Sequence, residues 1–136
     1  MRSKLLHGGH GERSFAIILD SGDEAMHVLQ EFAARERLGG AQLTAIGALS
    51  RAKLAFFEWE TKQYRPIPVD EQVEVASLVG DIAIGPDGKP SVQYSGGMTG
   101  PHWPAICWRH MCGQRWRSSY GNRPYICARS RTPKAA

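Results

Sequence analysis

Two histidines and two cysteines in the last third of the 136-residue chain are of the residue types that bind metals. They are His102, Cys107, His110 and Cys112. Zinc takes four nitrogen or sulfur ligands in tetrahedral geometry, and these side chains could supply them. Their spacing matches no standard zinc finger, however. We therefore interpret them as weak metal candidates and expect no metal there.

The acidic residues in the middle of the chain could in principle form a pair for acid–base chemistry. They are Glu58, Glu60, Asp70, Glu71 and Glu74. Charged residues at alternate strand positions are more typical of a solvated face, so only Glu74 is kept as a candidate to test. The chain has no nucleophile elbow, phosphate loop or dinucleotide fingerprint. We predict no catalytic residue.

Arginines alternate with tryptophans and tyrosines near the end of the chain, and such a pattern could bind nucleic acid by charge and stacking. A basic segment without a fold would also bind nucleic acid, but nonspecifically and with an affinity that depends strongly on salt. We favour the second interpretation. A histidine pair near the start, His7 and His10, could hold a metal, but a flexible loop is the simpler expectation.

The composition changes abruptly after about residue 91. Residues 1–91 carry ten Lys/Arg and thirteen Asp/Glu, whereas residues 92–136 carry seven Lys/Arg and no acid. All three cysteines and three of the four tryptophans also lie in the second part. Such a switch marks a boundary. We predict a domain over residues 1–93 and a different, basic tail over residues 94–136.

The elements that must position these residues are strands and one helix. Residues 12–20, 41–48, 51–61 and 73–84 are rich in the β-branched and apolar residues that favour strands. Apolar residues recur at helical spacing between the first two of these strands, which predicts a helix over residues 23–36.

Shorter signals predict how these elements begin, end and connect. Ser21 with Glu24 fits a capping box at the start of the helix. Turns are expected at residues 47–51 and 85–88, and an irregular connection at residues 62–68. The prediction is an α+β fold with a central, mostly antiparallel sheet and one main helix. From about residue 94 we expect irregular chain.

Three segments resemble the bacterial members of the plants-and-prokaryotes-conserved (PPC) domain family. They are residues 11–24, residues 45–52 with the stretch that follows them, and residues 73–83. Within these segments the family signature falls on Gly47, Ser50, Glu74, Ser77 and Gly80. The resemblance covers about two thirds of the chain.

The resemblance implies a PPC-like α+β domain that usually assembles as a homotrimer. Plant members accompany DNA-binding segments, and bacterial members are described as DNA-binding by that analogy. Intact members could bind zinc or a small ligand through family histidines, which have no counterpart here. The acidic balance of residues 1–91 counts against a broad DNA-binding face there, because phosphate contacts need clustered Lys/Arg.

The family pattern continues with a His-x-His strand, a Gly-Gly-His-Leu segment and a Thr-x-Glu-Val strand, all missing from this chain. We therefore read the tail's codons one frame over, joining the last base of each codon to the first two of the next. The codon between His102 and Trp103 must then encode Leu. The shifted frame permits a peptide close to VLGRHDGTALAGHLLAAHVRPTLEVIL, starting near Gln93. We infer that the tail arises from a frameshift.

We predict a PPC-domain protein that binds DNA or has a regulatory role and is not an enzyme. If the frameshift is real, we expect this form of the protein to be inactive. The alternative is a metal- or small-ligand-dependent enzyme that uses the absent family histidines, and a third possibility is a nonfunctional gene product. The chain has no membrane-spanning apolar run and no signal-peptide pattern, so a cytoplasmic location is expected. A frameshift predicts an unpaired edge at residues 73–84 and incomplete cover over Ile17, Leu19, Ile46 and Leu78.

Overall fold

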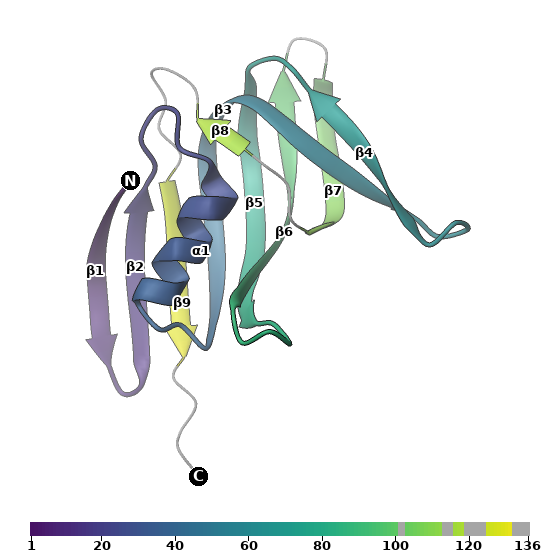
Figure 1. Ribbon diagram of the computed structural model, residues 1–136. Coiled ribbons are helices and arrows are strands. Elements are labelled where there is room, and N and C mark those ends of the chain that lie inside the picture. Colours follow the sequence, from purple (N-terminus) through teal and green to yellow (C-terminus); the bar gives the residue numbers. More distant parts are fainter. Residues whose placement is uncertain (101–102, 113–115, 119–124, 132–136) are drawn as a thin grey trace.

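One antiparallel sheet with a helix on one of its faces forms the described part of the chain (Figure 1). The computed structural model describes residues 1–100, 103–112, 116–118 and 125–131. In chain order the elements are β1 (Arg2–Gly9), β2 (Glu12–Ile18), α1 (Ala25–Arg35), β3 (Gly40–Glu58), β4 (Gln63–Val69), β5 (Val73–Ile84), β6 (Pro90–Gly100), β7 (Trp103–Cys112), β8 (Trp116–Ser118) and β9 (Tyr125–Arg131).

The strand order β1-β2-β9-β3-β5-β6-β7 places the last strand of the chain in the middle of the sheet. Every described pairing is antiparallel, and β4 and β8 also pair with β3. The predicted fold class is therefore confirmed. The expectation of irregular chain from about residue 94 was wrong, because β6 continues to Gly100 and three further strands follow. β5 is flanked by β3 and β6, so its predicted free edge was wrong too.

The core lies between α1 and the sheet face that it covers. Phe32 is fully buried, and its ring meets that of Phe15 on β2 edge to face, with the centroids 5.2 Å apart. Ile17, Leu19 and Leu78 are also buried, contrary to the expectation that they would be incompletely covered. Ile46 alone of the four keeps 58% of its surface exposed. Among the described residues, no helix is long and apolar enough to span a membrane.

Local hydrogen bonds set both ends of α1. Glu24, rather than the predicted Ser21, is the N-cap, and its carboxylate accepts from the backbone N–H groups of Met26 and His27. At the other end, Leu38 N–H donates to the Ala33 carbonyl and Arg37 N–H to that of Ala34. This is a Schellman motif, and Arg37 occupies its left-handed position at φ 52°.

A single 19-residue strand, β3, replaces the two strands predicted at residues 41–48 and 51–61. The expected turn between them is a bulge: the pairing with β5 shifts register between Ala45 and Gly47, where Gly47 has φ 145°. A bulge bends a strand without ending it. β3 can therefore leave the body of the sheet while it remains a strand.

The second half of β3 pairs with β4 in a hairpin that projects away from the sheet (Figure 1). We call this hairpin, residues 51–69, the arm. Residues 62–68 were predicted to be an irregular connection because they hold two prolines, yet Pro66 and Pro68 lie within β4. Proline is tolerated in a strand that needs no hydrogen bond on its outer side. The expected flexible loop at residues 7–10 was also wrong, since most of it belongs to β1 and His10 and Gly11 form a tight turn.

Candidate functional site

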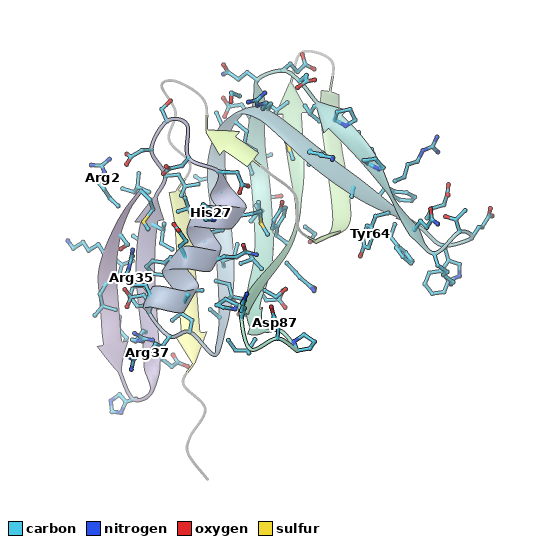
Figure 2. The ribbon with its side chains drawn as sticks, in the orientation of Figure 1. Arg2, His27, Arg35, Arg37, Tyr64 and Asp87 are labelled. Carbon is cyan, nitrogen blue, oxygen red and sulfur yellow. The ribbon has the colours of Figure 1, made fainter. Side chains whose placement is uncertain are left out.

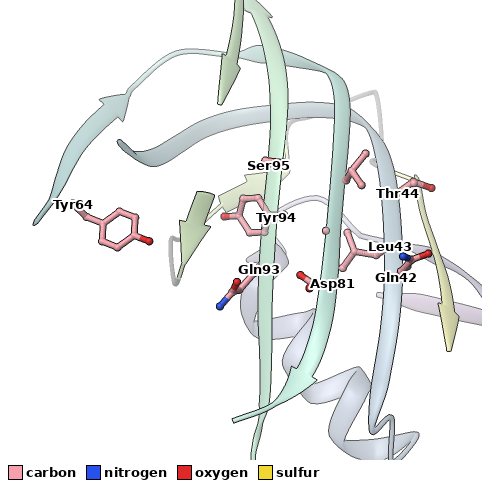
Figure 3. Close-up of a pocket in the computed structure, with 10 residues that line it drawn as sticks. Gln42, Leu43, Thr44, Tyr64, Asp81, Gln93, Tyr94 and Ser95 are labelled. Atoms are coloured by element: carbon pink, nitrogen blue, oxygen red, sulfur yellow. The ribbon is translucent and has the colours of Figure 1, made fainter. Parts of the chain in front are cut away.

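A hollow of about 470 Å³ lies between the arm and the face of the sheet that α1 leaves uncovered (Figure 3). Its size falls within the range of small-molecule sites. Strands β3, β5 and β6 form its floor, and Tyr64 approaches from β4. The lining residues are Gln42, Leu43, Thr44, Tyr64, Val79, Gly80, Asp81, Gln93, Tyr94 and Ser95.

Alternation along the strands decides which side chains face the hollow. Successive side chains of a strand point to opposite faces of the sheet. Leu43 is buried on the helix side, and its neighbours Gln42 and Thr44 are exposed on the other. On β6, buried Tyr94 lies between Gln93 and Ser95 in the same way. The buried residues that attach these strands to the core therefore also orient the polar residues of the hollow.

The side chains of the hollow can donate and accept hydrogen bonds but supply no positive charge. Gln42 and Gln93 carry amides, and Thr44, Ser95 and Tyr64 carry hydroxyls. Asp81 adds a carboxylate, and the lining contains no lysine or arginine. Such a set suits a neutral or cationic polar ligand better than an isolated anion. Within the described part of the chain, no group of three or more His, Cys, Asp or Glu could hold a metal ion.

Gly80 lets two floor strands approach closely. A Cβ atom at this position would lie 2.3 Å from the carbonyl oxygen of Gln93 and 2.7 Å from the Cβ of Tyr94. Because backbone and a buried ring occupy that space, any side chain would force β5 and β6 apart. The glycine thus allows β5 and β6 to lie close together in the floor of the hollow.

A second, shallower depression on the same face is almost wholly apolar. Leu6 on β1, Ile46 on β3 and Val79 on β5 line it and are all more than half exposed. Ala16 and Ala76 also contribute to its wall. We call the three large side chains the apolar patch.

The arm carries a cluster of aromatic rings at its far end. Phe57 pairs across the hairpin with Tyr64, and the ring centroids are 5.1 Å apart. On its other side the Trp59 ring lies 6.1 Å away, also edge to face. The Lys62 ammonium sits 3.3 Å from the Trp59 centroid. Trp59 is 74% exposed, so the cluster presents a wide aromatic surface to solvent.

The charged contacts of the amino-terminal region lie far from the hollow. The Met1 ammonium is 2.7 Å from Asp20 and 3.0 Å from Asp23. Hydrogen bonds to these two carboxylates raise the pKa of that ammonium above its usual value of 8.0. Figure 2 places neighbouring Arg2 on the opposite side of the molecule from Tyr64.

The five predicted signature residues all lie on β3 or β5, and most mark points where the backbone departs from regular pairing. Gly47 lies at the β3 bulge, and Ser77 follows a register shift between β5 and β6. Glu74 is exposed at the start of β5, opposite Ala48 and Thr99, and Ser50 is exposed on β3. Of the five, Gly80 alone reaches the hollow. Their role as a family signature stays a prediction.

The predicted metal candidates lie outside the part of the chain whose side chains can be placed. His102 falls outside the described residues. Cys107, His110 and Cys112 belong to β7, for which only the course of the strand is described. The structure therefore gives no distances among these four side chains.

Sequence inspection missed most of the hollow. The polar residues Gln42, Thr44, Asp81, Gln93 and Ser95 alternate with apolar neighbours, which could have marked them as one exposed face. The pattern could not show that three strands bring them together, because pairing register is a long-range property. Tyr64 was assigned to an irregular connection, so its approach from β4 could not be foreseen.

Comparisons with known proteins point to one family. The model of the Plants and Prokaryotes Conserved (PCC) domain, written PPC above, matches residues 6–105. The match thus continues past residue 93, where we predicted the domain to end. A search of curated proteins gave no match.

Several solved structures share the fold. A candidate DNA-binding protein from Ralstonia eutropha JMP134 is 24% identical, with a TM-score of 0.74 over 88% of this chain and 78% of that one. A PPC protein from Pyrococcus horikoshii is 20% identical, with a TM-score of 0.77 over 98% and 84%. A metal-containing protein from Archaeoglobus fulgidus is 19% identical, with a TM-score of 0.77 over 99% and 88%. At these identities the likeness establishes the fold.

Proposed function

The chain belongs to the Plants and Prokaryotes Conserved domain family, and from this premise we propose that it is a non-enzymatic DNA-binding protein with a regulatory role. The observation that carries the proposal is the pairing of two surfaces on one side of the molecule. The hollow offers hydrogen-bonding groups, and the arm beside it offers exposed rings with cations. Base edges are recognised by hydrogen bonds, and bases stack on aromatic rings.

The family relatives support the same class of ligand. The Ralstonia eutropha protein is named as a candidate DNA-binding protein, and it has the same fold. Family likeness alone is a weak argument for function, because one fold hosts many activities. The proposal therefore depends on the side chains of this chain more than on the relatives' names.

A metal-dependent enzyme is the competing proposal, and the Archaeoglobus fulgidus relative favours it because that protein contains a metal. The residues whose side chains the structure describes do not supply such a centre. Among residues 1–100, whose side chains are described, no cluster of three metal-ligating residues exists. The family histidines that we expect to hold a metal have no counterpart in this sequence. We derive no metal chemistry for this chain.

We also propose that the chain self-associates, as a trimer in its intact form. Leu6, Ile46 and Val79 expose apolar surface around one depression, and such patches on a protein surface mark interaction sites. The patch lies on the sheet face opposite α1, adjoining the hollow, since Thr44 and Val79 line both. Assembly through this face would place the hollows of neighbouring copies near one another.

A shifted reading frame from about Gln93 stays part of the proposal. Sequencing the gene through the codons for residues 91–97 tests it directly. We expect a single-base insertion or deletion whose repair restores the Gly-His-Leu and Thr-Leu-Glu-Val segments. If no single-base change opened that frame, the tail would have to be accepted as the protein's own. An intact mass matching the full 136-residue sequence would show that this polypeptide is made.

The DNA-binding proposal is tested by fluorescence anisotropy of the full chain against labelled DNA, at low and at physiological salt. Both a single strand and a duplex are needed as probes. We expect saturable binding that weakens as salt rises, because phosphate contacts release counterions. Absence of binding to either probe at low salt, by protein that unfolds cooperatively, would refute the proposal.

A further inference from the structure

The arm combines three properties that no other segment of residues 1–91 combines: it projects, it is aromatic and it is basic. Residues 51–69 carry four Lys/Arg and two Asp/Glu, a net charge of +2. Residues 1–50 carry five Lys/Arg and six Asp/Glu, and residues 70–91 carry one Lys/Arg and five Asp/Glu. The positive charge of the amino-terminal part is thus concentrated in the hairpin that also holds three of its exposed rings.

The ring geometry suits stacking with a ligand. Within the cluster, Phe57 is half-buried between Trp59 and Tyr64, which hold it edge to face at interplanar angles of 77° and 60°. Each outer ring thus contacts the middle one, while Trp59 stays 74% exposed and Tyr64 47% exposed. Phe56, on the opposite face of the hairpin, is exposed as well.

Cations accompany these rings. The Lys62 ammonium lies over Trp59, and Arg65 pairs across the hairpin with Phe56. Glu58 accepts a hydrogen bond from the Thr61 hydroxyl at 2.8 Å and lies 4.0 Å from the Arg65 guanidinium. At that distance on an exposed surface the Glu58–Arg65 pair is weak, so Arg65 can turn to a phosphate at little cost.

We propose that the arm is a stacking platform for single-stranded nucleic acid, with the hollow receiving a base from the same strand. Unpaired bases expose their faces, which rings can cover whatever the base, whereas the bases of a duplex are already stacked. Tyr64 belongs to both the aromatic cluster and the hollow (Figure 3), so it joins the two surfaces. This proposal rests on the proposed DNA-binding function and specifies its ligand and its site.

The alternative occupant of the arm is a second copy of the chain. Charge favours nucleic acid. The arm is basic, and the apolar patch that would receive it in a partner consists of Leu6, Ile46 and Val79, none of which complements a lysine or arginine. Association between copies through the arm would be detected by light scattering of the same variants.

The test is anisotropy of labelled 15-nucleotide thymidine and uridine strands and a matched duplex, titrated with the full chain. Trp59→Ala removes the most exposed ring, and Trp59→Phe restores an aromatic face. Lys62→Ala removes the arm cation. Lys4→Ala removes a lysine of equal charge from exposed β1, at the other end of the sheet (Figure 1).

We expect tighter binding of the single strands than of the duplex, and about tenfold weaker binding by Trp59→Ala with partial rescue by Trp59→Phe. The slope of log affinity against log salt concentration measures the number of phosphate contacts. Lys62→Ala should reduce the magnitude of this slope by about one, and Lys4→Ala should leave it unchanged. Circular dichroism should show every variant folded, because the altered side chains are exposed.

Each other result overturns the inference in a distinguishable way. If wild-type protein binds DNA and Trp59→Ala binds equally well, DNA is held elsewhere, for instance by the basic tail, and the proposed function survives. If the wild type binds neither single strands nor duplex, the proposed function fails too. If Trp59→Ala lowers the molar mass measured by light scattering, the arm is a surface for a second copy.

Discussion

The two halves of β3 share one strand but lie in opposite surroundings. The first half, up to Ala48, lies between β9 and β5, with α1 packed on one face. The second half leaves the sheet in the arm, where its rings meet solvent. A long strand with one bulge at Gly47 can thus build a rigid floor at one end and an exposed surface at the other. Because Ala52, Leu54 and Ala55 in the second half are still buried, stability should respond to buried residues in both halves, and binding to the exposed rings of the arm.

The largest expected effect separates core rings from arm rings. Phe32→Ala removes a fully buried ring that packs on Phe15, and should lower the free energy of unfolding by about 3–5 kcal/mol. Phe56→Ala removes a half-exposed ring from the arm and should cost less than about 1 kcal/mol. Urea unfolding measures both. Equal losses would mean that the Phe56 ring packs in the core.

Crowding between β5 and β6 predicts the next effect. Gly80→Ala places a methyl group within 2.3 Å of the Gln93 carbonyl oxygen and should destabilise the protein by about 1–3 kcal/mol. Gly39→Ala is the matched control, because no atom lies within 4 Å of its added methyl. Thermal unfolding followed by circular dichroism measures the difference. A Gly80→Ala protein as stable as Gly39→Ala would contradict the close approach of the two strands.

Substitution in the apolar patch should change the oligomeric state of the protein and leave its fold intact. Ile46→Arg places a charge on an exposed side chain, so the monomer should keep its stability while the trimer dissociates. Burial of such a side chain contributes about 1–2 kcal/mol per copy. Light scattering measures the molar mass. Phe56→Arg, on the arm, is the control, and loss of assembly there instead would move the interface to the arm.

The smallest expected effect concerns the floor of the hollow. Asp81 is the carboxylate among its lining residues, and it faces the region where we place a base of a strand whose backbone phosphates are negative. Asp81→Asn should strengthen binding of single-stranded thymidine about two- to threefold, because it removes a like charge at several ångströms in high dielectric. Anisotropy at low salt resolves a change of that size. Weaker binding by this variant would show that the carboxylate accepts a hydrogen bond from the base.

Sequence patterns predicted the elements that local physics controls. The helix, β2 and β5 follow from period and composition, and residues 85–88 form the expected turn, with the Gly88 N–H bonded to the Gly85 carbonyl. The second half of β6 was missed because Gly96, Gly97 and Gly100 hide its period. Gly96 is needed there, since a Cβ would lie 2.3 Å from the Ser77 carbonyl oxygen.

The candidate site was largely hidden from the sequence. Its residues come from three strands whose pairing only the folded chain reveals, and Tyr64 joins them because β3 passes through a bulge instead of a turn. The family signature included two backbone positions, Gly47 and Gly80. Those positions shape the sheet, whereas Gln42, Gln93 and the arm rings present the chemistry.

The affinity of Trp59→Ala for single-stranded thymidine tests the division between body and arm most directly. Because Trp59 is the most exposed of the arm's rings, its removal should weaken binding about tenfold and leave the unfolding temperature unchanged. Unchanged affinity in a protein whose wild type binds the strand would contradict the assignment of the arm as the binding surface.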